Sequence, residues 1–599
     1  MAERGAKAVI PAVPPVALPP AGGLADREML VVLLLGAVGG LVIGAAVAGV
    51  RTFVGDVQGL LFGVDVDMFG SAGVAPWRVV LVPLAGGLVL GLLLAAAGRL
   101  GRLAIVDPVE ANALEGGRMS MVDSLVLVGL SMVSISIGGS VGFEAAMTQL
   151  GAGLLSVVGQ RLGLTRRALR ILVSCGTGAG IAAIFDAPLA GTLYALELVV
   201  GGYAVRALLP TLVAAATSGL ATHLLVGYTP MFLAHDVGLP TLWHLPLALL
   251  VGAAAAVVGI AVMRGTTAFE GLLVRLRVPS IGRPVAGGLL LGLLAVAAPE
   301  VMGPGHNGID EILAGQNAAG ALAAVLLAKM AASIVCVGSG FRGGLFSASL
   351  FLGAALACVL HGVVVVPLLG PDAPIELTVV AGMAGVAASI VGTPIAIVLL
   401  AVETAGLNAG VVTVAVSVVV AAHLTRRFFG YSFSTWRFHV RGRELLGPRD
   451  VGRLQRLTLA DVPLAEPVRV AAGTPLAEAA RASRGAALPV VAVEAADGAF
   501  VGLVRRDRLA DAAADEPAAP IDGLAADAPP AAPRDRSLAR LVDAPIADVA
   551  GALAVVDGDG RLVGVVEEAA ALARYLDELV AADDDDAGPL SPKPAPGSP

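Results

Sequence analysis

Long apolar segments recur between residues 28 and 425 and predict a series of helices that cross a membrane. A crossing needs about 20 mainly apolar residues, and MLVVLLLGAVGGLVIGAAVAGV, VVLVPLAGGLVLGLLLAAA and LPLALLVGAAAAVVGIAVM approach that length. Shorter apolar pieces broken by Gly or Pro lie between them, such as SLVLVGLSMVSISI and AAIFDAPLAGTLYALELVV. Because such pieces cannot all span alone, we expect broken or tilted helices that meet inside the membrane, where their freed backbone lines a cavity.

Composition supports this interpretation. Charged residues make up 14% of the 599 positions, whereas soluble domains carry about 25%, so we expect an integral membrane protein. Residues 1–27 are rich in Ala and Pro and lack the basic-then-apolar order of a signal peptide, so we assign them to a cytoplasmic tail. The cysteines lie in apolar segments and predict small core residues, not a disulfide set or a metal site: Cys175, Cys336 and Cys358.

The character of the chain changes after the predicted membrane domain of residues 28–425. A basic connector follows at 426–455, and its arginines beside the last span indicate a cytoplasmic C-terminal end. A soluble region covers residues 456–580 and contains an Ala/Pro-rich stretch, 515–535, that predicts a linker. Residues 581–599 have the composition of a disordered tail.

Internal repeats divide both parts of the chain. In the membrane domain, GTGAGIAAIFDAPLAGTLYALE at 176–197 resembles GMAGVAASIVGTPIAIVLLAVE at 382–403, and GFEAAMTQLGAG at 142–153 resembles GLFSASLFLGAA at 344–355. We therefore predict two homologous halves, about 28–226 and 244–425. In the soluble region, LPVVAVEAADGAFVGLV resembles LAVVDGDGRLVGVV, and each predicts a strand, a tight Asp-Gly turn, a strand and a helix.

The glycine breaks of the two halves predict a site for an anion. A helix that begins inside the membrane directs unpaired N–H groups and its positive dipole end at whatever lies there, so no basic side chain is needed. Gly142 and Phe143 open such a helix in the first half, and the Gly-Gly-Leu-Phe run at 343–346 opens its counterpart. Converging helix starts would hold a small dehydrated anion weakly enough to release it. Only the first break adds a carboxylate, Glu144, among five glycines in residues 138–153.

In their order, these motifs resemble those of the CLC family of chloride channels and proton/chloride exchangers. GFEAAMTQLG resembles the family's Gly-Arg-Glu-Gly-Pro segment, and GSGFRGGLFSA resembles its Gly-x-Phe-x-Pro filter with the upstream Ser-Gly. APLAGTLYALE, GPGHNGIDEI and AGMAGVAASIVGTPIAIVLLAVE also fall in family order. The resemblance implies an all-α polytopic membrane domain of two inverted halves with broken, tilted helices, one pore per subunit and a homodimer.

The soluble region resembles a pair of CBS modules, which implies a small α/β cytoplasmic regulator able to bind adenine nucleotides. A plain folded spacer without a ligand is an equally open interpretation, because no acidic ribose-binding residue stands at a clear spacing.

The resemblance also assigns roles to individual residues. It places Glu144 in the position of the gating glutamate, whose carboxylate occupies the anion site until it is protonated or displaced. It matches Gly344, Leu345 and Phe346 to the filter, whose backbone N–H groups face the anion. The full set of candidate anion-binding residues is Gly142, Phe143, Gly344, Leu345, Phe346, Ser347, Ile105, Asp107 and Ser434.

Several positions depart from the family pattern. Ile105, in AIVDP, stands where the family has a pore serine, and Ser434 aligns best with the family's inner-pore tyrosine, although Tyr431 is near. Asp107 would repel an anion unless it is protonated or turned away, or it caps the helix after Pro108. Leu198 replaces the glutamate that passes the proton in exchangers. Ala348 replaces the filter proline, and two alanines follow the gating position.

Three further charged residues in apolar segments have structural interpretations. Glu197 and Glu403 occupy equivalent repeat positions, and we expect them to cap or pair rather than to take part in transport. We expect Lys329 to snorkel or to pair with a carboxylate rather than to serve the anion path.

These observations predict an anion transport protein of a bacterial inner membrane, with several spans and both termini in the cytoplasm. Leu198 favours passive, channel-like conduction of chloride or a similar anion over proton-coupled exchange, which is the alternative. A non-transporting membrane sensor is a third reading, but duplicated halves with aligned breaks exceed what an anchor needs. No Ser/His/Asp, Cys/His or metal-spaced cluster lies in the apolar region, so we expect no enzyme, no required cofactor and no nucleic-acid partner.

Overall fold

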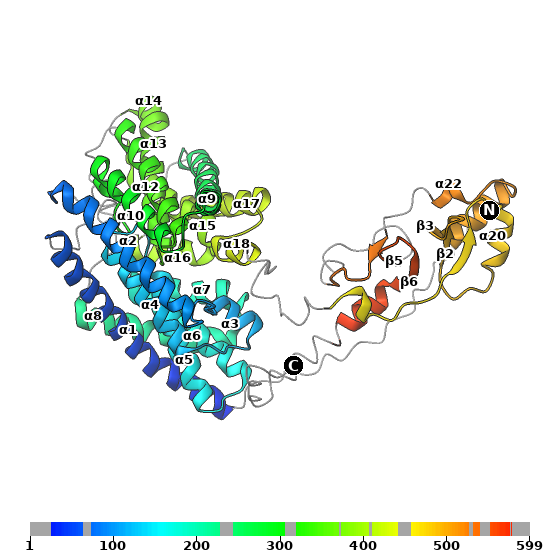
Figure 1. Cartoon of the computed structure of the whole chain (residues 1–599), viewed down its shortest axis with the longest axis horizontal. Helices are drawn as coiled ribbons and strands as arrows, with labels where there is room; N and C mark the ends of the chain where they lie inside the picture. Colours follow the sequence, from blue (N-terminus) through cyan, green and yellow to red (C-terminus); the bar gives the residue numbers. More distant parts are fainter. Residues whose placement is uncertain are drawn as a thin grey trace, which may run out of the picture.

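The computed structural model describes residues 26–63, 73–227, 243–305, 319–370, 373–406, 410–440, 457–525, 531–538 and 551–577 except 576. Figure 1 shows a large helical body formed by α1 to α18 and a smaller part that combines strands and helices. Nearly all of the predicted N-terminal tail, the second half of the connector and the tail from 581 onward lie outside the described residues.

The helical body follows the two predicted halves in order. The first contains α1 (Asp26–Phe62), α2 (Pro76–Arg99), α3 (Pro108–Leu114), α4 (Met121–Ser136), α5 (Glu144–Arg161), α6 (Arg166–Phe185), α7 (Pro188–Ala195), η1 (Leu196–Val200) and α8 (Val205–Val226). The second contains α9 (His244–Arg275), α10 (Gly282–Ala297), η2 (Pro299–Val301), α12 (Ala319–Ser339), α13 (Phe346–Leu360), η3 (His361–Val365), α14 (Val366–Leu369), α15 (Glu376–Val391), α16 (Pro394–Ala405), α17 (Val411–Phe428) and α18 (Phe433–Val440).

Within the described residues, eight helical segments are long and apolar enough to cross a membrane, and five apolar helices have only 10–17 residues. The mixture of full and short helices confirms the prediction of a multi-pass protein with interrupted segments. The three cysteines are buried and free, as expected for small core residues.

The repeat is visible in how helices cross. In the first half, a Cβ built on Gly176 of α6 would lie 2.2 Å from the carbonyl oxygen of Gly151 in α5. In the second half, a Cβ on Gly382 of α15 would lie 2.4 Å from the carbonyl oxygen of Gly353 in α13. Backbones this close exclude any side chain, so each crossing requires glycine on both helices. The predicted duplication is therefore also a repeat of three-dimensional structure.

Two carboxylates join the halves by capping each other's helices. Glu403, in α16, accepts hydrogen bonds at the start of α7, and Glu197, in η1 directly after α7, accepts them at the start of α16. The four bonds join Glu403 Oε1 to Leu189 N (2.9 Å), Glu403 Oε2 to Ala190 N (2.7 Å), Glu197 Oε1 to Ile395 N (3.1 Å) and Glu197 Oε2 to Ala396 N (3.0 Å). Negative charge is favourable at a helix N-terminus, and the predicted capping role of both residues is confirmed.

The C-terminal region contains two similar three-stranded sheets. The first has the order β1 (Val468–Ala471), β2 (Val490–Glu494) and β3 (Phe500–Arg505), with α20 (Leu476–Ala482) and α21 (Arg506–Asp515). The second has the order β4 (Ala532–Pro533), β5 (Ala552–Val556) and β6 (Leu562–Glu567), and helical residues 568–575 follow. In each sheet the first pair is parallel and the second antiparallel. Both predicted strand–turn–strand–helix units are confirmed.

The predicted linker at 515–535 is partly wrong. Ile521 is fully buried, and with Ala525 it belongs to the apolar core of the first sheet. The Leu476 N–H also donates to the carbonyl oxygen of Ala519 (2.9 Å). The stretch around α22 (Asp522–Ala525) is therefore folded onto the first module, because its few apolar residues are buried in the core of the first sheet.

The glycine crossings predict a steep cost for a single methyl group. Gly176→Ala forces the crossing of α5 and α6 apart, because its Cβ meets backbone atoms that cannot turn away. We expect a loss of about 1–3 kcal/mol from overpacking, seen as a lower melting temperature of the detergent-purified protein. Gly129→Ala, on α4, is the matched control, since its Cβ would meet nothing within 4 Å. In this variant the higher helix propensity of Ala should stabilise the helix by about 0.5–1 kcal/mol. Equal melting temperatures for the two variants would contradict the crossing argument.

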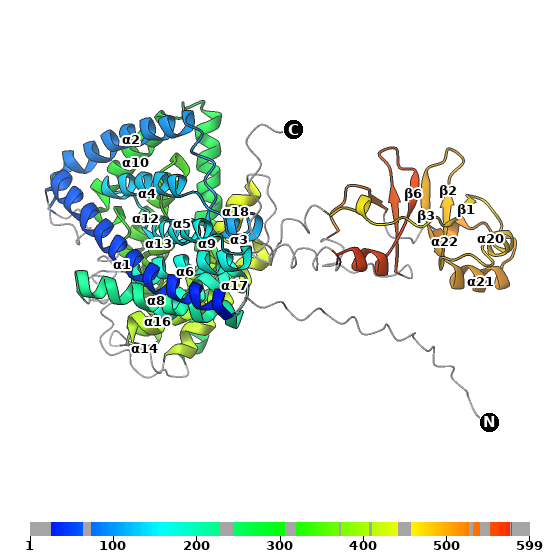
Figure 2. The same ribbon diagram turned by 90° about the horizontal axis from the view of Figure 1, so that it is seen from below.

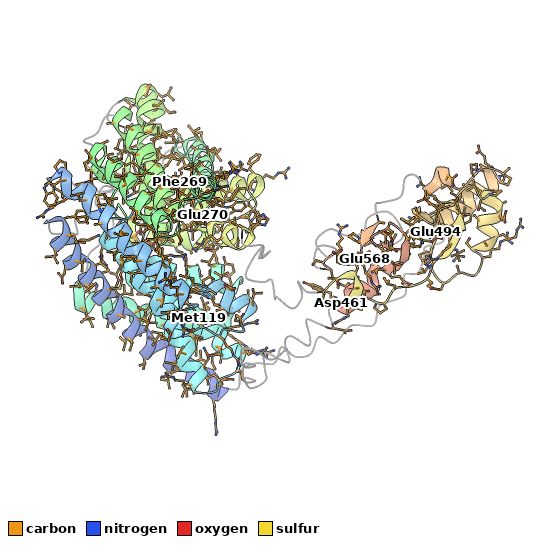
Figure 3. The ribbon with its side chains drawn as sticks, viewed as in Figure 1. Met119, Phe269, Glu270, Asp461, Glu494 and Glu568 are labelled. Atoms are coloured by element: carbon orange, nitrogen blue, oxygen red, sulfur yellow. The ribbon has the colours of Figure 1, made fainter. Side chains whose placement is uncertain are left out.

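The reciprocal caps predict a second stability effect. Glu403→Ala leaves the first N–H groups of α7 without their acceptor, so we expect a loss of about 1 kcal/mol, measured by thermal unfolding. Glu270→Ala removes an exposed carboxylate on α9 (labelled in Figure 3) and should change stability by less than about 0.5 kcal/mol. If both variants unfold at the same temperature, the caps do not stabilise the protein.

Candidate functional site

The two predicted helix starts lie side by side in the structure. The Gly142 N–H donates to the Gly344 carbonyl oxygen (2.8 Å), and the Gly344 N–H donates back to Gly142 (3.0 Å), which forms a short antiparallel bridge. Two residues after each glycine a helix begins, α5 at Glu144 and α13 at Phe346. Both helices lie within the helical body (Figure 2). The halves therefore direct their first-turn N–H groups into one place, which confirms the predicted convergence.

Glu144 fills the space between these helix starts. Glu144 is 2% exposed, and its Oε1 accepts hydrogen bonds from the backbone N–H of Ser347 (2.9 Å) and from the Ser347 hydroxyl. Its Oε2 accepts no hydrogen bond from the described residues. A buried carboxylate held by the first turn of another helix occupies the position that such a turn offers to an anion.

Two glycines leave the room that this carboxylate needs. A Cβ on Gly142 would lie 2.1 Å from Glu144 Oε2, and a Cβ on Gly344 would lie 2.8 Å from the same oxygen. Any larger residue at either position would push the carboxylate away. We name the space bounded by Gly142, Gly344 and Ser347 the anion cradle; in this structure the Glu144 side chain lies in it.

Aromatic rings surround the start of α13. The Phe346 ring lies 4.8 Å from that of Phe185, the last residue of α6, and 6.0 Å from that of Tyr194 in α7 (centroid distances). Leu345 and Phe346 are both buried in the main apolar core. Sequence reasoning missed Phe185 and Tyr194, although both flank the repeated segment around Pro188, because no spacing along the chain indicates contact with residue 346.

Asp107 acts as a helix cap. Its Oδ1 accepts a hydrogen bond from the Glu110 N–H (2.9 Å) at the start of α3, which supports the capping interpretation. The segment that contains Ile105 is fixed to α5, because Gln149 Nε2 donates to the Val106 carbonyl oxygen (3.0 Å). Ile105 and Asp107 are both half-buried beside this helix.

The remaining predicted residues lie in other surroundings. Ser434 is half-buried in the first turn of α18, and its neighbour Phe433 packs against the apolar core that contains Phe346. Tyr431 is engaged elsewhere, since its hydroxyl is bonded to His439 Nδ1 (3.1 Å) and its ring stacks on the same imidazole. Leu198 is buried in an apolar cluster with residues of α3 and α6.

The expectation for Lys329 is partly wrong: the structural role holds, but the predicted partner does not. This residue is fully buried on α12, so it does not snorkel, and its ammonium pairs with no carboxylate in the described part of the chain. Its Nζ donates instead to four successive carbonyl oxygens: Glu300 (3.4 Å), Val301 (3.0 Å), Met302 (3.4 Å) and Gly303 (2.8 Å). The segment around η2 has carbonyls that no helix satisfies, and the ammonium supplies their donors.

The segment around η2, whose carbonyls Lys329 binds, lies against the loop that leads to Glu144, because the Gly303 N–H donates to the carbonyl oxygen of Gly138 (3.1 Å). Lys329 therefore stabilises the segment that packs against the loop before Glu144, and its own side chain does not line the anion cradle.

Comparison with known proteins identifies the family. Residues 86–427 match the family described as voltage gated chloride channel. The chain is 32% identical over 377 residues to a protein of Ralstonia nicotianae described as chloride channel protein ClcB-like. The alignment covers 62% of this chain and 87% of that protein.

Two solved structures share the fold. A slow cyanobacterial Cl−/H+ antiporter has a TM-score of 0.59 and 20% identity, over 70% of this chain and 99% of that one. A CLC-type fluoride/proton antiporter has a TM-score of 0.55 and 25% identity, over 68% of this chain and 98% of that one. The family match spans more than half of the 599 residues and includes both helix starts of the anion cradle. The chain therefore belongs to the voltage-gated chloride channel, or CLC, family of membrane transport proteins.

Proposed function

We propose that this protein is an anion channel of the CLC type, in which Glu144 is the gate. The observation that carries the proposal is the carboxylate of Glu144 in the anion cradle, bonded to the N–H and hydroxyl of Ser347. A bound anion and this carboxylate need the same donors, so they compete for one place. Protonation removes the negative charge of Glu144, weakens its hold on Ser347 and opens the cradle to chloride.

The proposed anion ligands are the hydrogen-bond donors that hold the Glu144 carboxylate in this structure and become free when it moves away. The Ser347 N–H and hydroxyl are released when the carboxylate departs, and the glycines at 142 and 344 keep the space open. Phe143, Leu345 and Phe346 contribute the backbone of the two helix starts. Because Ile105 cannot donate a hydrogen bond, the Ser347 hydroxyl takes over the part of a pore serine. We also propose that Ile105, Asp107 and Ser434 lie along the path that the anion takes through the protein.

Passive conduction is favoured over proton exchange by the surroundings of Leu198. The side chain is 9% exposed and packed among apolar residues, so it offers no group that passes a proton. Proton-coupled exchange is the second candidate, because both structures that share the fold are described as antiporters, one for chloride and one for fluoride. The Ralstonia relative is described as a channel.

Assembly and location follow from the family resemblance. We expect a homodimer with one pore per subunit, in the inner membrane of a bacterium, with both termini in the cytoplasm. Chloride or another small anion and the lipid bilayer are its expected partners, and transport needs no cofactor.

Adenine nucleotide is the proposed ligand of the C-terminal region. A pocket of about 400 Å³ lies at the second sheet, lined by Pro489, Gly551, Ala552, Glu567, Glu568, Ala569 and Leu572; Glu568 is labelled in Figure 3. The lining includes two carboxylates and no basic side chain, so it suits the hydroxyl groups of a ribose and would repel phosphates. A nucleotide bound here would direct its phosphates outward.

The gate predicts a characteristic dependence on pH. Chloride efflux from liposomes should rise as the pH falls, because protonation releases Glu144 from Ser347. Glu144→Gln cannot ionise, so its flux should be high and flat across the same range. Ser347→Ala removes one of the two donors to Glu144 and should shift the opening of the gate toward higher pH. An unchanged pH profile in Glu144→Gln would refute the gate assignment.

The channel proposal predicts that chloride moves without protons. Chloride flux and proton uptake are measured together in liposomes, with fluoride and nitrate as further anions. We expect anion flux down its gradient and no proton movement in proportion to it. Protons driven uphill at a fixed ratio to the anion would favour the exchanger instead.

A further inference from the structure

Tyr194 brings a hydroxyl group to the apolar region beside the anion cradle. Its ring lies 6.0 Å from that of Phe346, the first residue of α13. It also packs against a second apolar cluster, together with Val106 and with Leu198. The side chain therefore lies between the start of α13 and the segment just before α3.

The hydroxyl of Tyr194 has no hydrogen-bond partner within the described residues. Tyrosines elsewhere in the chain do have one: Tyr203 donates to Glu197 Oε1 (2.7 Å), and Tyr431 is bonded to His439. Polar groups in a protein interior are nearly always satisfied by protein or by something bound. A half-buried phenol without a protein partner therefore has a hydroxyl open to a partner that the chain does not supply, either water or a bound anion.

The charges around Tyr194 indicate what that partner is. Asp107 directly follows Val106, which packs in the same cluster as Tyr194. Glu144 is bonded to Ser347, the residue after Phe346, whose ring contacts that of Tyr194. Carboxylates from two elements therefore lie near Tyr194. An anion that leaves the cradle on this side meets negative charge and the apolar cluster that contains Val106. A phenol O–H directed at the anion offsets that repulsion, because hydrogen bonds to charged groups are among the strong ones.

Resting on the channel function proposed above, we propose that the Tyr194 hydroxyl donates a hydrogen bond to the transported anion on the Asp107 side of Glu144. The ligand is a small, partly dehydrated monovalent anion such as chloride. Tyr194 thereby supplies a side-chain donor near the segment that contains Ile105, whose own side chain has none. The ring contact with Phe346 holds this donor at a constant distance from the start of α13.

The test uses the full-length protein in detergent and in liposomes. Chloride affinity is measured by isothermal titration calorimetry in the Glu144→Gln background, where the gate is uncharged. Tyr194→Phe keeps the ring against Phe346 and removes only the hydroxyl, so we expect affinity to fall about tenfold, the size of one hydrogen bond to a charged group. Tyr203→Phe, which loses a hydroxyl bonded to Glu197, is the matched control and should leave chloride affinity unchanged.

A second variant guards against a simple folding defect. Tyr194→His returns an N–H donor to the position and should recover part of the lost affinity, while melting temperature and elution volume are followed for each variant. Unchanged chloride affinity and flux in Tyr194→Phe would overturn this inference and leave the channel function intact. Wild-type protein that binds and moves no anion would overturn both.

Discussion

The site depends on one hydrogen-bonded contact, the carboxylate of Glu144 on the first turn of α13. The carboxylate comes from one half of the duplicated domain and the helix start from the other. Neither half alone contains both the occupant and its binding place. The helix dipole favours any negative charge at this point, so the donors that hold the carboxylate are already in place for the anion of the proposed function.

This contact requires that the two halves be held at a constant distance. Within each half, a glycine crossing packs the helix that opens the site against its neighbour, α5 against α6 and α13 against α15, at backbone contact. The bridge between Gly142 and Gly344 joins the loops directly. Lys329 adds support from behind, because it satisfies the carbonyls of the segment that holds Gly138. Packing, backbone pairing and a buried cation thus all act on the few residues around Glu144.

Much of this could be predicted from sequence because the signals are local or repeated. Glycine breaks, the duplicated segments and the lone Glu144 identify the helix starts, and the repeat places them as counterparts. Contacts between distant segments left no such pattern. Tyr194 meets Phe346 only through the packing of α7 against the start of α13, and Lys329 meets carbonyls of an irregular segment that has no periodicity. The predicted linker was partly wrong for a related reason: its composition is typical of loops, yet Ile521 and Ala525 are buried in the core of the first sheet.

The reciprocal caps of Glu197 and Glu403 bear on how the protein moves. Transporters that alternate access do so largely by rocking one repeat against the other. Here the two repeats exchange four hydrogen bonds at the starts of α7 and α16, and all four would have to break for such a motion. These bonds oppose a rocking of the repeats, whereas the Glu144 side chain can rotate without breaking any of them. Side-chain rotation takes far less time than the microseconds to milliseconds of domain motion. The reciprocal caps thus join the two repeats into one unit around the Glu144 side chain, so the faster motion available at the site is that of the side chain itself.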